Sequence, residues 1–275
     1  MSKKITIDIN NKDTDYWDNI SSHYVLDEKF IRKYMDKLDM DLISQYQKLS
    51  EEFIREFSDK VDWFWISQSQ NLSEDFIKEF SDKVDWTLIS CYQKLSESFI
   101  RVFSDKVIWC NISYFQKLSE YFIREFSNKV SFGYISKCQK LSPEFIKEFN
   151  LQIPETCWLY KDKEFKREYI KNNTSYEIIG DKVIAYKSCR SDGYSCYNFQ
   201  YYYNVNREYE SNADYNIGAI DSFGLSAWTK EKALQYHYTG KLFKVEIDLE
   251  DIAAIVHDRN KIRASKIKIL KEEKF

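Results

Sequence analysis

The sequence predicts an α-solenoid of about six helix-pair repeats followed by a small α+β domain. A 23-residue unit recurs over residues 17–153, and its apolar positions step along the chain in register. The composition changes near residue 175, beyond which lie five of the six glycines and a dense run of tyrosines. A fixed period of this length indicates units that cannot bury their apolar faces alone and must stack on their neighbours.

Residues 1–16 precede the repeats and are expected to form an N-terminal strand or arm. Polar and apolar side chains alternate from Lys4 to Ile9, which is the period of a strand with one buried face. A secretory signal peptide would instead carry an unbroken apolar stretch.

Each repeat in residues 17–153 is predicted to contain two short helices. A serine fits the N-cap of the second helix, because acidic residues follow it and favour the positive end of the helix dipole. Helices of about ten residues are too short to persist alone in water, so their apolar columns should form one buried ladder. The columns are Trp63, Trp86, Trp109 and Phe132; Ile43, Ile66, Ile89, Ile112 and Ile135; Leu49, Leu72, Leu95, Leu118 and Leu141; Phe53, Phe76, Phe99, Phe122 and Phe145; the caps are Ser50, Ser73, Ser96, Ser119 and Ser142.

A function of the solenoid is expected where the copies differ while the scaffold stays fixed. Two columns vary: His23, Tyr46, Ser69, Tyr92, Phe115 and Cys138 form one, and Asn19, Leu42, Trp65, Leu88, Asn111 and Tyr134 form the other. Large aromatic side chains exposed on a rigid array are typical of a protein-binding surface. We therefore predict that a protein partner binds Tyr46, Trp65, Tyr92, Phe115 and Tyr134. The alternative is that these side chains only complete the packing between repeats.

The repeat ends near Pro154, and residues 154–175 are predicted to be a capping helix and linker. Residues 176–275 are predicted to be the α+β domain. Strands are expected at residues 183–186, 199–203, 242–247 and 266–270, and a helix is expected at residues 229–238 with Thr229 as a possible N-cap.

Two resemblances add expectations about function. The segments Ala185–Ser188, Phe199–Tyr201, Phe223–Ser226, Lys241–Ile247 and Lys261–Lys266 resemble a C-terminal domain of unassigned function in phage and prophage proteins. The 23-residue units resemble repeats of phage, giant-virus and anaerobe proteins. These resemblances imply a non-enzymatic interaction or inhibitor protein, in which the solenoid grips a protein partner such as a host-defence component.

A third resemblance, to ADP-ribosyltransferases, gives the alternative of a nucleotide-binding or transferase domain that the solenoid delivers to a target. The family's Tyr-Arg/His-Gly strand would correspond to Tyr186 and Lys187, its Phe-x-Ser-Thr-Ser strand to Phe223–Ser226 with Thr229, and its catalytic-Glu strand to Arg263–Lys268. The last segment offers Lys266 and Lys268 instead of the glutamate, and a positive charge cannot stabilise a cationic transition state. Enzymatic activity therefore stays open, with a non-enzymatic role favoured. The candidate ligand-binding residues are Tyr186, Lys187, Arg190, Tyr201, Ser226, Thr229 and Arg263.

Composition also indicates whether the chain is expected to bind nucleic acid, span a membrane or hold a metal or cofactor. The formal charge of -3 does not favour nucleic acid, although the basic run from Lys261 to Lys274 could contact phosphates. No run of about 18 uncharged apolar residues is present to span a membrane, and the six cysteines lack zinc-site spacing, which favours reduced thiols in a cytoplasmic protein. No metal is expected at the acidic positions Glu246, Asp248, Glu250 and Asp251, which strand alternation also explains. No cofactor is expected either, except NAD or another nucleotide under the alternative.

Overall fold

The computed structural model describes residues 7–154, 157–196, 199, 201–217, 222–236 and 240–273. The chain divides into two compact units, Met1–Asp85 and Trp86–Phe275. Residues 1–6 of the predicted N-terminal strand lie outside the described residues, and residues 7–13 form turns and coil before the first helix.

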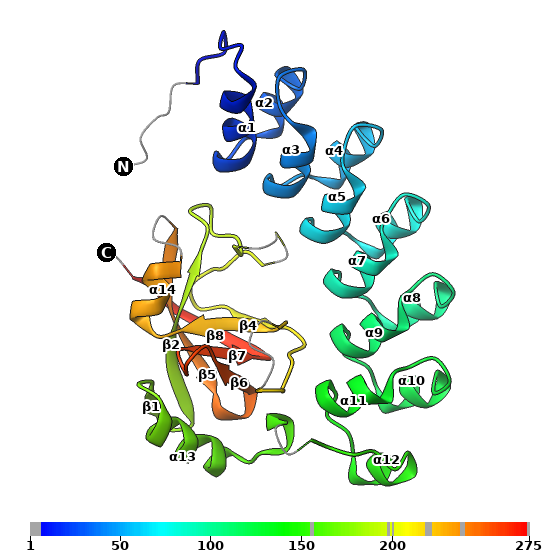
Figure 1. The fold of residues 1–275 in the computed structure, drawn as a ribbon, viewed down its shortest axis with the longest axis vertical. Coiled ribbons are helices and arrows are strands. Elements are labelled where there is room, and N and C mark those ends of the chain that lie inside the picture. Colours follow the sequence, from blue (N-terminus) through cyan, green and yellow to red (C-terminus); the bar gives the residue numbers. More distant parts are fainter. Residues whose placement is uncertain are drawn as a thin grey trace. The chain divides into compact units, whose positions relative to one another are not determined.

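Helix pairs with a 23-residue period form the first part of the chain, as predicted (Figure 1). In the first unit the helices are α1 Thr14–His23, α2 Glu28–Lys33, α3 Met40–Tyr46, α4 Glu51–Glu56, α5 Trp63–Ser69 and α6 Glu74–Glu79. In the second unit they are α7 Trp86–Tyr92, α8 Glu97–Val102, α9 Trp109–Phe115, α10 Glu120–Glu125, α11 Phe132–Cys138 and α12 Pro143–Glu148.

The predicted serine caps are confirmed in every copy. The Ser50 Oγ atom accepts a hydrogen bond of 3.1 Å from the backbone N–H of Phe53, and Ser73, Ser96, Ser119 and Ser142 make the same contact. Pro143 occupies the first position of α12, where proline's missing N–H has no helical acceptor in any case. The caps therefore fix where each second helix begins.

The isoleucine, leucine and phenylalanine columns are buried, but the tryptophan column is only half-buried, contrary to the expectation of a fully buried ladder. The Trp63 indole stacks on Phe76 at 6.3 Å and donates its Nε1–H to the Ser58 carbonyl oxygen. The Lys83 ammonium lies 5.7 Å from the same indole ring. The tryptophan column thus forms the outer layer of the ladder, because each ring packs on a phenylalanine of the ladder while a lysine ammonium lies over it.

A buried glutamine bridges adjacent repeats within each unit. Gln47 is buried, donates its side-chain N–H groups to the carbonyl oxygens of Ser21 and Tyr24 at 2.7 Å each, and accepts the N–H of Leu26. The same position, at Gln116, donates to the carbonyl oxygens of Ser90 and Gln93. These bonds satisfy backbone groups that the short helices leave without a partner.

Arginine and glutamate side chains form ion pairs between adjacent repeats within each unit. The Arg55 guanidinium pairs with Glu79 of the next repeat at 2.8 Å and lies 5.1 Å from the Phe76 ring. Arg101 makes the equivalent contacts with Glu125 and Phe122. Each partly exposed pair contributes little alone, but its stacking on a buried ring adds to the contact between repeats.

The rest of the second unit is an α+β domain built on an antiparallel sheet. Its strands are β1 Glu177–Ile179, β2 Lys182–Cys189, β3 Glu208–Glu210, β4 Leu225–Trp228, β5 Lys241–Asp248, β6 Ile252–Val256, β7 Lys261–Ala264 and β8 Lys266–Glu273. Within the described residues the order is β3-β8-β5-β2-β4-β7-β6, with β1 paired to β2. The helical elements are η1 Trp158–Tyr160, α13 Lys163–Asn173, α14 Lys230–Tyr236 and η2 Leu249–Asp251.

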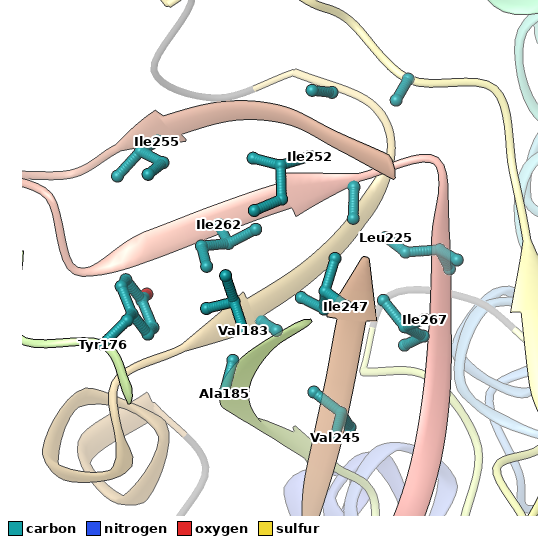
Figure 2. Close-up of a cluster of buried hydrophobic side chains, with 14 of the residues drawn as sticks. Tyr176, Val183, Ala185, Leu225, Val245, Ile247, Ile252, Ile255, Ile262 and Ile267 are labelled. Atoms are coloured by element: carbon teal, nitrogen blue, oxygen red, sulfur yellow. The ribbon is translucent and has the colours of Figure 1, made fainter. Parts of the chain in front are cut away.

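The core of this domain lies on one face of the sheet. Figure 2 shows side chains from six strands converging there, among them Val183, Leu225, Val245, Ile255 and Ile267. The helix predicted after Thr229 is confirmed, because α14 begins at Lys230 and the Thr229 carbonyl oxygen accepts the N–H of Ala233. The strand predicted at residues 199–203 is wrong for the described residues, where Tyr202 makes only an isolated bridge to Tyr194.

Candidate functional site

A buried hydrogen bond ties the repeats of the second unit to the sheet domain. The Tyr114 hydroxyl, from α9, donates to a carboxylate oxygen of Asp214 at 2.6 Å and lies 3.1 Å from the Ser222 hydroxyl. Asp214 is 1% exposed. Burial, followed by the hydrogen bond to Asp214, raises the pKa of Tyr114 well above its usual range. The tyrosine therefore stays a neutral donor to a carboxylate that would be costly to bury alone.

Aromatic and amide contacts surround this bond. The Phe223 ring packs 4.7 Å from Tyr114 and 4.8 Å from Phe115, and Tyr134 lies 4.8 Å from Tyr114 on the neighbouring repeat. The Asn212 side chain donates to the carbonyl oxygens of Tyr114 and Gln116. Phe115, a variable position of α9, is thus packed against this chain's own sheet domain.

A buried arginine of the sheet supports the segments that carry Asp214 and Phe223. Arg263 of β7 is fully buried, and its guanidinium donates to the carbonyl oxygens of Asp214 and Asn216 at 2.7 Å each. Gly224 has a φ of +130°, and a Cβ atom there would lie 2.7 Å from Arg263 Cγ. Only glycine lets the backbone pass so close to the arginine in that conformation.

A cavity of about 970 Å³ lies beside these contacts, between α7 and α9 on one side and the sheet domain on the other. Over the described residues β2 and β4 are paired at one register position, Tyr186 with Trp228, and the ladder does not continue to Ser188 and Ser226. Lys187, Ser188 and Ser226 line the cavity at this place. Parting strands expose polar groups to a ligand, which a continuous ladder would not.

Lys187 is the lining residue that best indicates what kind of ligand the cavity could bind. Its side chain is 9% exposed, and its ammonium donates to the Ser226 carbonyl oxygen at 2.9 Å and lies 4.9 Å from the Tyr203 ring. Among the described residues no carboxylate lies within ion-pair distance of it. Burial, with a smaller contribution from the neighbouring charge of Lys261, lowers the pKa of Lys187 to about 8.

Other groups around the cavity combine cations, aromatic rings and a thiol. Lys261 is 8% exposed and lies 5.2 Å from the Trp228 ring, and both residues line the cavity. Cys196 also lines it, and burial raises the pKa of that thiol. A protonated thiol is a poor nucleophile, so the cavity offers charge and ring faces more readily than a reactive sulfur.

The structure brings some of the sequence-predicted site residues together and separates others. Tyr92, Phe115, Lys187, Tyr201 and Ser226 all line the cavity. Tyr134 packs on Tyr114, whereas Tyr46 and Trp65 belong to the first unit.

The remaining candidate ligand-binding residues are not among the cavity's lining residues. Tyr186 lies under the Lys230 ammonium, and Arg190 pairs with Asp192 at 3.1 Å. The Thr229 N–H donates to the Asn260 carbonyl oxygen. Arg263 supports the Asp214 segment from the sheet.

Several residues of the site were not among the candidates chosen from the sequence. Tyr114 occupies a repeat position where the other copies carry Gln45, Gln68, Cys91 and Lys137. An aromatic residue in an otherwise polar column is a mark that could have singled it out. Tyr203 and Trp228 had no such mark, because only the folded sheet places them beside the two lysines.

The described part of the basic run that begins at Lys261, and the acidic cluster from Glu246 to Asp251, are largely neutralised by ion pairs with neighbouring side chains. Lys266 pairs with Glu208 and Glu210, and Lys268 pairs with Glu246. In the acidic cluster, the Lys163 ammonium lies 3.7 Å from Asp248 and 3.1 Å from Glu250. Within the described residues, no group of three or more histidine, cysteine or acidic side chains could hold a metal ion.

The chain has no match among protein-family models, curated proteins or solved structures. The resemblances to phage and prophage proteins and to ADP-ribosyltransferases therefore stay predictions. No helix in the described part of the chain is long and apolar enough to cross a membrane.

Proposed function

We propose that this chain binds a small anionic molecule in the cavity beside β2 and β4, without transforming it. The observation that carries the proposal is Lys187, a cavity-lining ammonium that is nine-tenths buried and has no carboxylate partner among the described residues. An uncompensated buried charge is costly, and a bound anion would offset that cost. Perturbed titratable groups in a cavity are typical of functional sites.

Binding without turnover is favoured by the engagement of the nearby carboxylates. Glu210 and Asp251 line the cavity, but Glu210 pairs with Lys266 and Asp251 lies 3.3 Å from the Ser265 hydroxyl. Neither is positioned like the unencumbered glutamate that ADP-ribosyl transfer would need.

A thermal-shift titration with inorganic pyrophosphate tests this proposal. Pyrophosphate should raise the melting temperature of the full chain in a saturable way, because a ligand that binds only the folded state stabilises it by mass action. Lys187→Met should abolish the shift, whereas Lys147→Met, a change at an exposed position of α12, should leave it intact. The proposal fails if the two variants respond alike.

A second candidate function is the binding of a protein partner, such as a host-defence component, by the repeats of the first unit. Tyr46 is 36% exposed and Phe64 is 47% exposed there, and Trp65 packs edge-on against Phe64. Exposed aromatic side chains are enriched among the residues that dominate protein interfaces. Affinity capture with Tyr46→Ala and Trp65→Ala should lose the partner, while Tyr121→Ala on α10 should retain it. Equal recovery with all three variants would contradict this candidate.

A further inference from the structure

We propose that the helical repeats supply the ring-binding half of the cavity, so that Tyr92 and Phe115 hold the planar ring of a phosphorylated aromatic ligand of the nucleoside-monophosphate class. This inference rests on the proposed function, because it takes Lys187 as the residue that holds the anionic end.

The two aromatic residues occupy the same position in consecutive repeats. Tyr92 ends α7 and Phe115 ends α9, and both line the cavity. Tyr92 is 39% exposed, so packing between repeats leaves part of this residue accessible. Aromatic faces presented side by side on a rigid array form a platform on which a planar ring can stack.

The Phe115 half of the platform is held in place before any ligand arrives. Phe115 lies 4.8 Å from Phe223 and 4.9 Å from Tyr114, whose hydroxyl is fixed by Asp214. A side chain that is already fixed loses little conformational entropy when a ligand binds.

The cavity is too large for an inorganic anion alone. Its volume of about 970 Å³ is near the upper end of the ~300–1,000 Å³ typical of small-molecule sites. A ligand that reaches both Lys187 and the aromatic platform must carry an anion and a flat apolar group on one framework. Ser188, Ser195 and Ser226 also line the cavity, and serine hydroxyls can hydrogen-bond a polar linker such as a sugar.

The charge of the lining favours a phosphate over a carboxylate as the anionic end. Among the described lining residues are the lysines Lys94, Lys117, Lys187, Lys261 and Lys266, against the carboxylates Glu210 and Asp251. A phosphomonoester carries a charge of about −1.5 to −2 near neutral pH, which matches this excess of cations better than a single negative charge.

Calorimetric titration of the full chain with adenosine monophosphate and with ribose 5-phosphate tests the inference, because the two probes share the phosphate and differ in the ring. The ring should make adenosine monophosphate bind at least about tenfold more tightly, since stacking one base on an aromatic side chain contributes about 1–3 kcal/mol. Tyr92→Leu should remove most of this advantage and leave the affinity for ribose 5-phosphate within about twofold. Tyr46→Leu, the same repeat position in the first unit, is the matched control and should change neither affinity.

The outcomes separate the two proposals. Equal affinity for both probes, or equal weakening of both by Tyr92→Leu, would overturn the ring-binding role while leaving anion binding in place. Binding of neither probe, together with no response to pyrophosphate, would overturn the proposed function itself and this inference with it.

Discussion

The repeats of the first unit and those of the second have the same scaffold but present their variable positions differently. In both units a serine caps the second helix, a glutamine bridges adjacent copies, and an arginine pairs with a glutamate of the next copy. Tyr46 in the first unit is 36% exposed, whereas Phe115 in the second is packed against Phe223. The repeated positions therefore determine the fold, and the variable positions determine what each stretch of the array contacts.

The largest expected effect tests whether the scaffold is shared. Phe53 and Phe122 occupy the same column and are both fully buried. Phe53→Ala and Phe122→Ala should each lower the free energy of unfolding by about 3–5 kcal/mol, because both leave a cavity in the ladder. Urea unfolding followed by circular dichroism measures the loss. A difference of more than about 2 kcal/mol between the two variants would show that the two stretches are not equivalent scaffolds.

The next effect is a pH dependence of folding stability that Lys187 should cause and an ordinary surface lysine should not. Its pKa in the folded state is about 8, below the 10.5 of an unperturbed lysine, so between these values the unfolded state binds more protons and stability rises with pH. The free-energy cost of burying the Lys187 ammonium is fully present below pH 8 and disappears above pH 10.5. Relative to Lys187→Met, the wild type should gain about 2 kcal/mol between pH 7 and pH 9.5.

Urea unfolding at both pH values gives this difference, and groups that titrate in both proteins cancel from it. Lys147→Met serves as the control and should follow the wild-type pH dependence. A wild type that gains no stability relative to Lys187→Met would contradict the burial of an unpaired ammonium in this cavity.

A smaller effect contrasts two glycines of the second unit. Gly224→Ala should destabilise the chain by about 2 kcal/mol, because the new methyl group would meet Arg263 and the backbone has a positive φ. Gly133→Ala lies in α11 with space around it and should stabilise by about 0.4–1 kcal/mol. Thermal unfolding of both variants is the measurement. Stabilisation by both would mean that Arg263 does not support the Asp214 segment as described.

The smallest effect concerns the bond between the repeats of the second unit and the sheet domain. Tyr114→Phe removes only the hydroxyl, and should cost about 1–2 kcal/mol because Asp214 loses a buried donor. Tyr121→Phe, at a position that is 72% exposed, should change the unfolding free energy by less than about 0.5 kcal/mol. Indistinguishable values would mean that the bond does not hold the sheet domain to α9.

The sequence predicted the parts of the fold that local chemistry fixes. The serine caps and the helix period are set within a few residues, and α14 follows Thr229 as expected. The strand expected at residues 199–203 failed because the consecutive tyrosines there form an isolated bridge and line a cavity instead of joining a ladder. A high aromatic content alone cannot distinguish these two outcomes.

The site was less predictable because it joins residues far apart in the chain. Lys187 was a candidate from the resemblance to ADP-ribosyltransferases, but its burial beside Tyr203 and its lack of a carboxylate partner among the described residues depend on the folded sheet. Tyr92 and Phe115 were expected to bind a protein, and the structure gives them a cavity within their own unit. The bond from Tyr114 to Asp214 spans 100 residues of sequence, and no local pattern encodes it.

A crystal structure of the chain soaked with adenosine monophosphate would test the central claim most directly. The account predicts density for the phosphate within hydrogen-bond distance of Lys187 Nζ, roughly 3 Å, and for the base against the Tyr92 ring. A cavity that stays empty at a saturating concentration, or a nucleotide bound away from Lys187, would contradict it.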